Sequence, residues 1–113
     1  MEQLTIFDVF QVDTEEHDIQ TLPEEDMIRM VSEQTGIVFK EDKNAPQSKY
    51  TWYRATKGNN YIDVHYEHYF KDDKRFIGVS IGNNMGGSSC PCDSLKEAID
   101  RIKRNMRIYG WSR

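Results

Sequence analysis

The sequence predicts an α+β domain in which a three-stranded antiparallel meander is flanked by an N-terminal and a C-terminal helix. The first observation is a turn signal, Lys57-Gly58-Asn59-Asn60, between two runs rich in aromatic and β-branched residues. The second is a pair of helix-start signals, one in residues 21–26 and one in residues 94–97. The third is the size of the chain, because 113 residues, 37% of them apolar and 30% charged, suit one globular domain.

The first helix is expected from Thr21 to Gly36. Pro23 suits the first turn, and the three acidic residues that follow it place negative charge at the positive end of the helix dipole. Met27 and Val31 recur at helical spacing, which predicts a buried stripe. Gly36 is a natural end for the helix because glycine readily adopts the left-handed conformation of a C-cap.

Three strands are expected between the two helices. The hairpin joins a strand at residues 50–56 to one at residues 61–70, a third strand follows at residues 75–81, and residues 37–39 could begin a further short strand. Alternating polarity in the second strand predicts one buried face and one face in solvent. The positions expected in the core are Ile62, Val64, Tyr66 and Phe70, and those expected in solvent are Tyr61, Asp63, His65, Glu67 and Tyr69.

A segment rich in glycine and serine, residues 82–89, is expected to form a loop before the last helix. Ser94 and Glu97 have the spacing of a capping box, in which the two side chains satisfy the first free backbone N–H groups. Apolar residues then recur at helical spacing from Leu95 to Tyr109, and Gly110 is expected to end the helix.

The predicted domain organisation is a peptide and acidic linker at residues 1–20, followed by one α+β domain at residues 21–113. Residues 1–42 contain twelve acidic and two basic residues, whereas residues 94–113 contain two acidic and six basic residues. This asymmetry indicates either a nucleic-acid or protein partner, or two halves of the chain that attract each other when folded.

The sequence also predicts several absences. No apolar run approaches 18 residues and no signal peptide is recognisable, so we expect a cytoplasmic protein without membrane contact. Cys90 and Cys92 are expected to be reduced, because a bridge across the single residue between them would be strained. No catalytic triad or nucleotide-binding fingerprint is recognisable, so no enzymatic activity and no cofactor are expected.

The opening peptide offers a first candidate for partner binding. Gln3-Leu4-Thr5-Ile6-Phe7 resembles the bacterial sliding-clamp-binding peptide, with Ile6 where the family has leucine. The resemblance implies that Leu4, Ile6 and Phe7 would fill an apolar pocket of the partner while Gln3 bonds at its rim. The same spacing also suits an ordinary amphipathic element that packs on its own domain.

The solvent face of the predicted hairpin offers a second candidate, because aromatic rings and charges alternate there. Rings and arginine on an open sheet suit base stacking or a protein interface. The residues assigned to partner binding are Trp52, Arg54, Tyr61, His65, Glu67 and Tyr69. Asp63, His65 and Glu67 could ligate a metal by residue type, but steps of about 7 Å along one strand make convergence on one ion awkward, so no metal is expected.

A wider resemblance suggests a context. The opening Gln3-Leu4-Thr5-Ile6-Phe7-Asp8 and the segment from Pro91 to Ile99 look like uncharacterised proteins of phages and conjugative elements of Gram-positive bacteria. The expected function is therefore a non-enzymatic binding protein of a mobile element that contacts host nucleic-acid or defence machinery, such as an anti-CRISPR-type inhibitor or a clamp-docking accessory. The acidic residues of segment 13–33 would then imitate phosphate or dock on a basic cleft.

Two alternatives remain open from the sequence. The last helix could bind nucleic acid directly through its basic residues together with the aromatic sheet face. The basic residues of this alternative are Arg101, Lys103, Arg104 and Arg107. The other alternative is a thiol enzyme that uses Cys90 or Cys92, although no partner base is indicated in the sequence.

Overall fold

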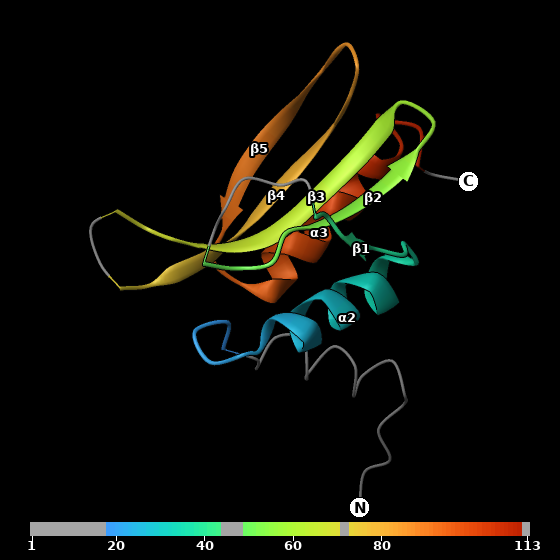
Figure 1. Cartoon of the computed structure of the whole chain (residues 1–113). Coiled ribbons are helices and arrows are strands. Elements are labelled where there is room, and N and C mark those ends of the chain that lie inside the picture. Colours follow the sequence, from blue (N-terminus) through green and yellow to red (C-terminus); the bar gives the residue numbers. More distant parts are fainter. Residues whose placement is uncertain (1–17, 44–48, 71–72, 112–113) are drawn as a thin grey trace, which may run out of the picture.

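The computed structural model describes residues 18–43, 49–70 and 73–111 (Figure 1). The predicted clamp-binding peptide at residues 3–7 and most of the predicted linker lie outside these residues. No helix within the described ranges is long and apolar enough to cross a bilayer.

The fold is α+β, as predicted, but the meander has five antiparallel strands rather than three, in the order β1-β2-β3-β4-β5. The strands are β1 (Lys40–Glu41), β2 (Tyr53–Lys57), β3 (Asn60–His68), β4 (Arg75–Asn83) and β5 (Gly86–Cys92). The predicted hairpin is confirmed, and Gly58 supplies the positive φ of 63° that its two-residue turn requires. The first strand starts at Lys40, after the segment predicted to form it.

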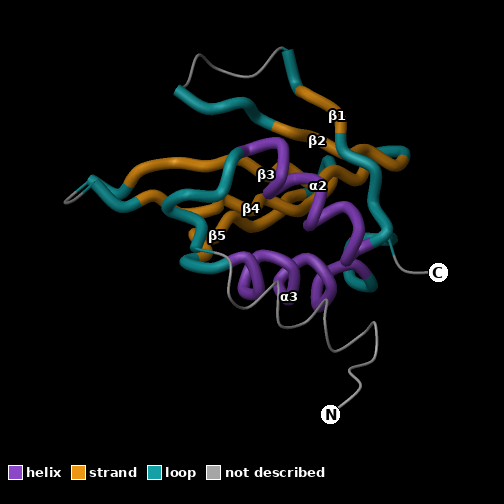
Figure 2. Tube along the Cα trace, turned by 90° about the horizontal axis from the view of Figure 1, so that it is seen from below, coloured by secondary structure: helices purple, strands orange, loops and turns teal. Residues whose placement is uncertain are grey.

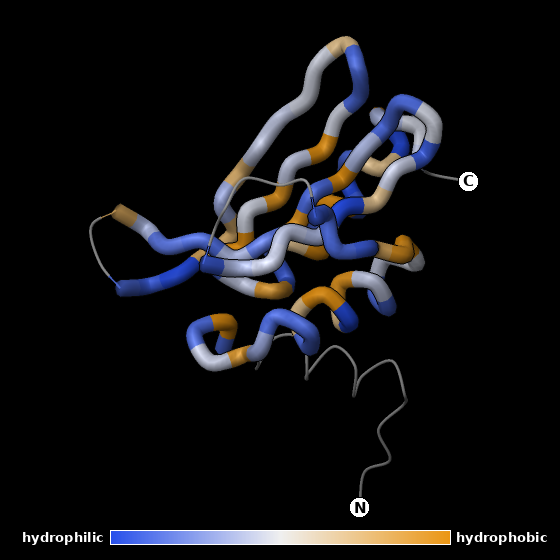
Figure 3. The backbone as a smooth tube through the Cα atoms, viewed as in Figure 1, coloured by the Kyte–Doolittle hydropathy of each residue, from blue (hydrophilic) through white to orange (hydrophobic). Residues whose placement is uncertain are grey.

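The strand that the sequence analysis missed is β5. The predicted loop at residues 82–89 is the end of β4, a tight turn at Asn84 and Met85, and most of β5. The Asn83 side chain accepts a hydrogen bond from the Met85 N–H at 2.8 Å and so stabilises the turn. Figure 3 shows why the strand escapes a hydropathy pattern, since β5 is pale along most of its length while β4 alternates.

Both helices cover the same face of the sheet (Figure 2). Helix α2 (Glu24–Thr35) follows Pro23 and ends at Gly36, which has a left-handed φ of 75° as expected of a C-cap. Helix α3 (Leu95–Met106) begins with the predicted cap, because the Ser94 hydroxyl accepts a hydrogen bond from the Glu97 N–H at 3.1 Å. This helix ends at Met106, four residues before the predicted end.

The core lies between this inner face of the sheet and the two helices. Alternate residues of β3 and β4 face each other across the pair, for example Val64 and Val79, and both are fully buried. The complete core is Ile19, Leu22, Met27, Val31, Ile37, Ala55, Ile62, Val64, Tyr66, Ile77, Val79, Ile81, Cys92, Leu95, Ala98, Ile99 and Ile102. Phe70 was expected in this core, but it lies beyond the end of β3 and is fully exposed.

The end of the predicted linker packs on the domain. Ile19 is buried, and Arg75 fixes the segment by donating hydrogen bonds to the carbonyl oxygens of Ile19 at 2.5 Å and Leu22 at 2.6 Å. The Arg75 guanidinium also lies 3.9 Å from the ring centroid of Tyr66, whose hydroxyl donates to Leu22 at 2.8 Å. Burial raises the pKa of Tyr66 to about 12. The described residues 18–20 therefore belong to the folded unit.

Candidate functional site on the outer face of the sheet

The face of the sheet that the helices leave uncovered is called the outer face here. The strand register places on it Arg54, Tyr61, Asp63, His65, Glu67, Phe76, Gly78, Ser80, Gly82, Gly87, Ser89 and Pro91. The sequence predicted that the β3 residues of this face lie in solvent. That prediction is wrong for Asp63 and His65, each of which is only 6% exposed.

His65 is buried because its ring lies flat on the sheet. The Trp52 indole stacks on it with the ring centroids 3.9 Å apart and the planes 12° apart. The imidazole lies directly above Gly78 on the neighbouring strand, so that a Cβ at this glycine would stand 2.9 Å from the His65 Cε1 atom. The missing side chain of Gly78 therefore makes the room that the imidazole occupies.

The polar atoms of this stack are only partly satisfied. The Nε2 atom of His65 lies 3.2 Å from the Glu67 carboxylate. The Nδ1 atom of His65 and the Nε1 atom of Trp52 are buried, and neither has a hydrogen-bond partner among the described residues. The Glu67 carboxylate can only accept a hydrogen bond, so its contact with His65 places a proton on Nε2.

A second ring is seated in the same way towards the other end of the strands. The Tyr61 hydroxyl lies over Gly82 and Gly87, where a Cβ on either residue would stand 3.0 Å from it. The Arg54 guanidinium in turn lies 5.0 Å from the Tyr61 ring centroid, a cation–π distance. Glycines on β4 and β5 therefore receive the aromatic side chains of β3 at two places on the outer face.

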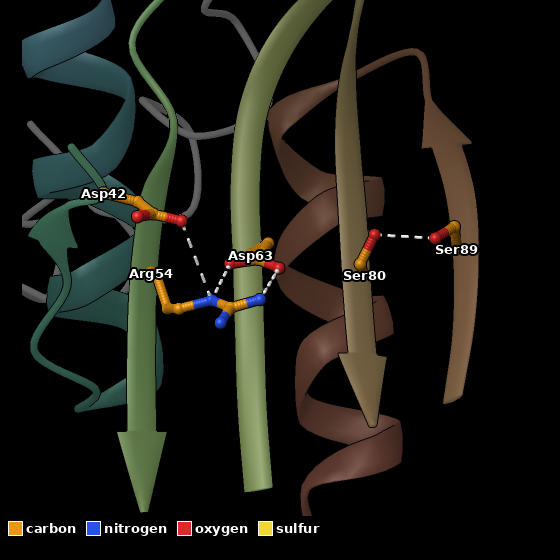
Figure 4. Close-up of polar contacts among 5 residues, drawn as sticks. All are labelled: Asp42, Arg54, Asp63, Ser80 and Ser89. Atoms are coloured by element: carbon orange, nitrogen blue, oxygen red, sulfur yellow. Dashed lines mark hydrogen bonds and ion pairs between the residues drawn. The ribbon is translucent and has the colours of Figure 1, made fainter. Parts of the chain in front are cut away.

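The buried carboxylate of Asp63 is neutralised by a two-pronged ion pair. Arg54 on β2 donates from Nε at 2.7 Å and from Nη2 at 2.8 Å to the two Asp63 oxygens (Figure 4). The hydrogen bonds that Arg54 donates to Asp63 raise the pKa of Arg54 above its ordinary value. On the next strands the Ser80 and Ser89 hydroxyls share a hydrogen bond of 2.6 Å. Arg54 was assigned to partner binding, but its guanidinium is engaged with Asp63 and Tyr61.

Beside these rings the outer face has a groove of about 880 Å³. The aromatic residues that line it are Trp52, His65, His68, Tyr69, Phe70 and Phe76, and the small residues that line it are Gly78, Ser80, Ser89, Cys90 and Pro91, with Val79 and Glu67 completing the lining. The Tyr69 hydroxyl donates a hydrogen bond to the Asp93 carboxylate, which raises the pKa of Tyr69 to about 12. The groove is therefore bounded by rings, and its floor over β4 and β5 is made of small side chains.

The structure brings together four of the ten residues assigned to partner binding. Trp52, His65, Glu67 and Tyr69 line the groove, whereas Arg54 and Tyr61 lie beside it on the outer face. Gln3, Leu4, Ile6 and Phe7 lie outside the described residues. The sequence analysis missed Phe70, Phe76, Ser89 and Pro91, all of which line the groove. The alternation of glycines with apolar residues on β4 was the available signal.

The four basic residues assigned to nucleic-acid binding, Arg101, Lys103, Arg104 and Arg107, differ in their surroundings. Arg101 donates from Nη2 to the Ser88 hydroxyl at 2.7 Å, and its Nε atom is buried. Lys103, Arg104 and Arg107 are exposed. Three of the four residues assigned to nucleic-acid binding are therefore exposed, in the last turn of α3 and directly after it.

The structure also describes the two cysteines and the residues that were considered as metal ligands. Cys90 and Cys92 are free thiols, and Cys92 is buried while Cys90 is half-buried. Burial raises the pKa of Cys92 to about 12. Among the described residues no group of three or more potential ligands has the geometry of a metal site.

Comparison with protein-family models, with curated proteins and with solved structures found no match to this chain.

Proposed function

We propose that this chain is a non-enzymatic binding domain for another protein, and that the partner occupies the groove on the outer face. The observation that carries the proposal is the concentration of aromatic side chains around one hollow of about 880 Å³. Aromatic residues are enriched in protein interfaces, where they supply much of the binding energy. Phe70 is fully exposed at the groove, and a partner that covered it would remove a large apolar side chain from water.

The groove is shaped for an apolar or aromatic side chain of the partner. Ser80, Ser89 and Pro91 are short side chains on β4 and β5 beside the taller Trp52 and Phe76. The hydroxyls of the two serines and the carboxylate of Glu67 can fix the orientation of the bound segment through hydrogen bonds. Glu67 is the acidic residue of the lining, so a basic group next to the apolar side chain would be favoured.

Part of this surface is ordered before binding. The stack of Trp52 on His65 and the seat of His65 on Gly78 fix two ring orientations, so binding costs little side-chain entropy there. The same stack contains two buried polar atoms without a hydrogen-bond partner among the described residues, Nδ1 of His65 and Nε1 of Trp52. The two rings are therefore held by packing and not by hydrogen bonds at these atoms.

The kind of partner stays a prediction from the sequence. The resemblance of residues 3–7 to the sliding-clamp-binding peptide supports a partner in host nucleic-acid or defence machinery. Helix α2, which carries the acidic residues of segment 13–33 from Glu24 onward, lies on the opposite side of the sheet from the outer face (Figures 1 and 2). Phosphate mimicry by α2 and docking in the groove are therefore contacts of two separate surfaces.

A photo-crosslinking experiment tests the groove as the docking site. A benzoylphenylalanine residue placed at Phe70 or Phe76 should give the same discrete adduct in lysate of cells that contain the protein. The matched control places the photo-crosslinker at Ile108, which is 71% exposed and lies beyond the end of α3. Adducts that do not differ between groove and control positions, or no adduct from either groove position, would contradict the proposal.

Direct nucleic-acid binding is a second candidate, supported by one observation. Lys103, Arg104 and Arg107 are exposed at the end of α3, and residues 101–113 contain no acidic residue. Three phosphate contacts predict an affinity that falls with a log–log salt slope of roughly −2 to −3. Fluorescence anisotropy with single-stranded and duplex DNA and RNA measures this slope, and replacement of the three residues by glutamate should abolish it while Lys57→Glu should not. An affinity that does not depend on salt would reject this candidate.

A further inference from the structure

Strand β5 forms one edge of the sheet and is paired on one side only, with β4. Pro91 has no N–H, so its pairing with Gly78 is of the type in which the two residues exchange no hydrogen bond. Because the two pair types alternate along an antiparallel ladder, Ser89 opposite Ser80 and Gly87 opposite Gly82 are of the same type. The backbone N–H and C=O groups of these β5 residues therefore point away from β4, in the plane of the sheet and outward from its edge.

The outward-pointing backbone groups of β5 form a regular row of hydrogen-bond donors and acceptors. Gly87 and Ser89 each present an N–H and a C=O, and Pro91 presents a C=O. Gly87, Ser89 and Pro91 are exposed, and within the described part of the chain no strand pairs with this edge. Such a row is a template for a further strand.

The side chains of β5 do not protect this edge. The strand has seven residues and carries no charge, in a chain of which 30% is charged. Natural edge strands are commonly blunted by lysine, by short length or by proline. Pro91 is a weak block because it lies next to the last residue and leaves the N–H groups of Gly87 and Ser89 available.

We infer that the outer edge of β5 pairs antiparallel with β5 of a second copy of this chain, about a twofold axis at Ser89. In this register Ser89 faces its own copy and exchanges two hydrogen bonds with it. Gly87 faces Pro91 of the other copy, so the N–H of each Gly87 donates to a proline carbonyl. The missing N–H of Pro91 falls opposite a glycine carbonyl at each end, where water can replace it.

The absence of charge on β5 selects a second copy over other occupants. The whole chain has a net charge of −4, so two copies repel each other over most of their surface. Along β5 the opposed residues are small and neutral, which brings no like charges together and allows the backbones to approach. A strand from a basic partner would find no charged residue on β5 to select it.

The pairing has a consequence for the outer face. Residues opposite each other across paired strands point to the same side of the sheet, so the outer faces of the two copies would form one continuous ten-stranded surface. Ser89 and Pro91 line the groove as well as the edge, so the two grooves would lie on either side of the twofold axis. This inference does not depend on what the groove binds.

Sedimentation equilibrium of the full chain with Ser89 variants tests the inference. The wild type should dimerise, and Ser89→Pro, which removes the two hydrogen bonds at the axis, should weaken the dimer at least about tenfold. Ser89→Ala is the matched control, because it loses the hydrogen bond to Ser80 but keeps the N–H, and it should dimerise like the wild type. Circular dichroism spectra and melting temperatures show whether each variant is folded.

Charge pairing across the axis supplies an independent measurement. Ser89→Lys alone and Ser89→Glu alone should both be monomeric, because each places like charges opposite each other, whereas their mixture should form a one-to-one heterodimer. A wild type that is monomeric at millimolar concentration would overturn the inference. So would a dimer that is unaffected by Ser89→Pro and by both charged variants. Crosslinking at Phe70 is scored separately, so failure of this inference leaves the proposed function standing.

Discussion

The two faces of the sheet are buried by different physical means. The inner face is covered by α2 and α3, and fully buried aliphatic side chains such as Val64 and Val79 fill the space between the layers. The outer face has no layer above it in the described residues, yet Asp63 and His65 are as inaccessible as parts of the core. There the side chains of one strand cover each other and the glycines of the next.

The difference shows that alternating polarity along a strand predicts which face of the sheet each side chain lies on. It does not predict whether that face is exposed to solvent. A polar residue can be sealed within a single layer if a ring can lie over a glycine on the neighbouring strand. Such a surface presents aromatic rings whose orientations are set by contacts within the sheet. The inner face, in contrast, depends on volume and packing density.

The largest effect is expected on the inner face. Ile77→Ala removes a fully buried side chain between the sheet and the helices and should lower the free energy of unfolding by about 2–5 kcal/mol. Phe70→Ala removes a larger apolar side chain that is fully exposed, and it should change stability by less than about 0.5 kcal/mol. Urea denaturation measures both. Similar losses for the two variants would show that the described packing is wrong.

A smaller effect is expected where a ring covers glycine on the outer face. Gly78→Ala places a Cβ 2.9 Å from the His65 ring and should cost about 1–3 kcal/mol by displacing the stack with Trp52. The loss should be smaller in a His65→Ala background, where the ring is absent, and Trp52 fluorescence should report the displacement. An equal cost in both backgrounds would mean that the glycine serves the backbone and not the ring.

The α+β class, the two helices and three of the five strands followed from the sequence. Helix α2 has a glycine C-cap, helix α3 has a serine N-cap, and both have apolar stripes. The central hairpin has a turn that requires glycine, so local signals and tertiary packing agree there. Strand β5 did not follow, because glycine, serine and proline have low strand propensity and the strand depends on pairing with β4. By composition alone, residues 86–92 resemble a loop. The strand becomes evident only from its pairing with β4 and from the Tyr61 side chain that lies over Gly87.

The candidate site followed only in part from the sequence. Trp52, His65 and Tyr69 were identified because aromatic residues alternate with charges on the predicted hairpin. The groove also depends on Phe76 and Gly78 of β4 and on the small residues of β5, a strand that was not predicted. The seat of His65 on Gly78 depends on cross-strand register, which hydropathy alone leaves undetermined.

The smallest predicted effect concerns the reactivity of the two cysteine thiols on β5, where the burial of the inner face ends. Cys92 is buried and its pKa is raised to about 12, whereas Cys90, two residues earlier on the same face, is half-buried. Iodoacetamide at pH 8 should therefore alkylate Cys90 in the native protein and reach Cys92 only after unfolding. Mass spectrometry of peptides from native and unfolded protein measures both sites, with Cys90→Ser as the control that should remove native labelling.

The same thiol predicts how stability depends on pH. The pKa of Cys92 is higher in the folded than in the unfolded protein, so folding favours the protonated thiol, and this contribution is complete below the unfolded pKa. It should be lost as the pH rises from the ordinary thiol value towards about 12. Cys92→Ala should flatten this part of the pH profile of the unfolding free energy, and Cys90→Ser should leave it unchanged. Equal slopes for the wild type and Cys92→Ala would show that Cys92 does not titrate as its burial requires.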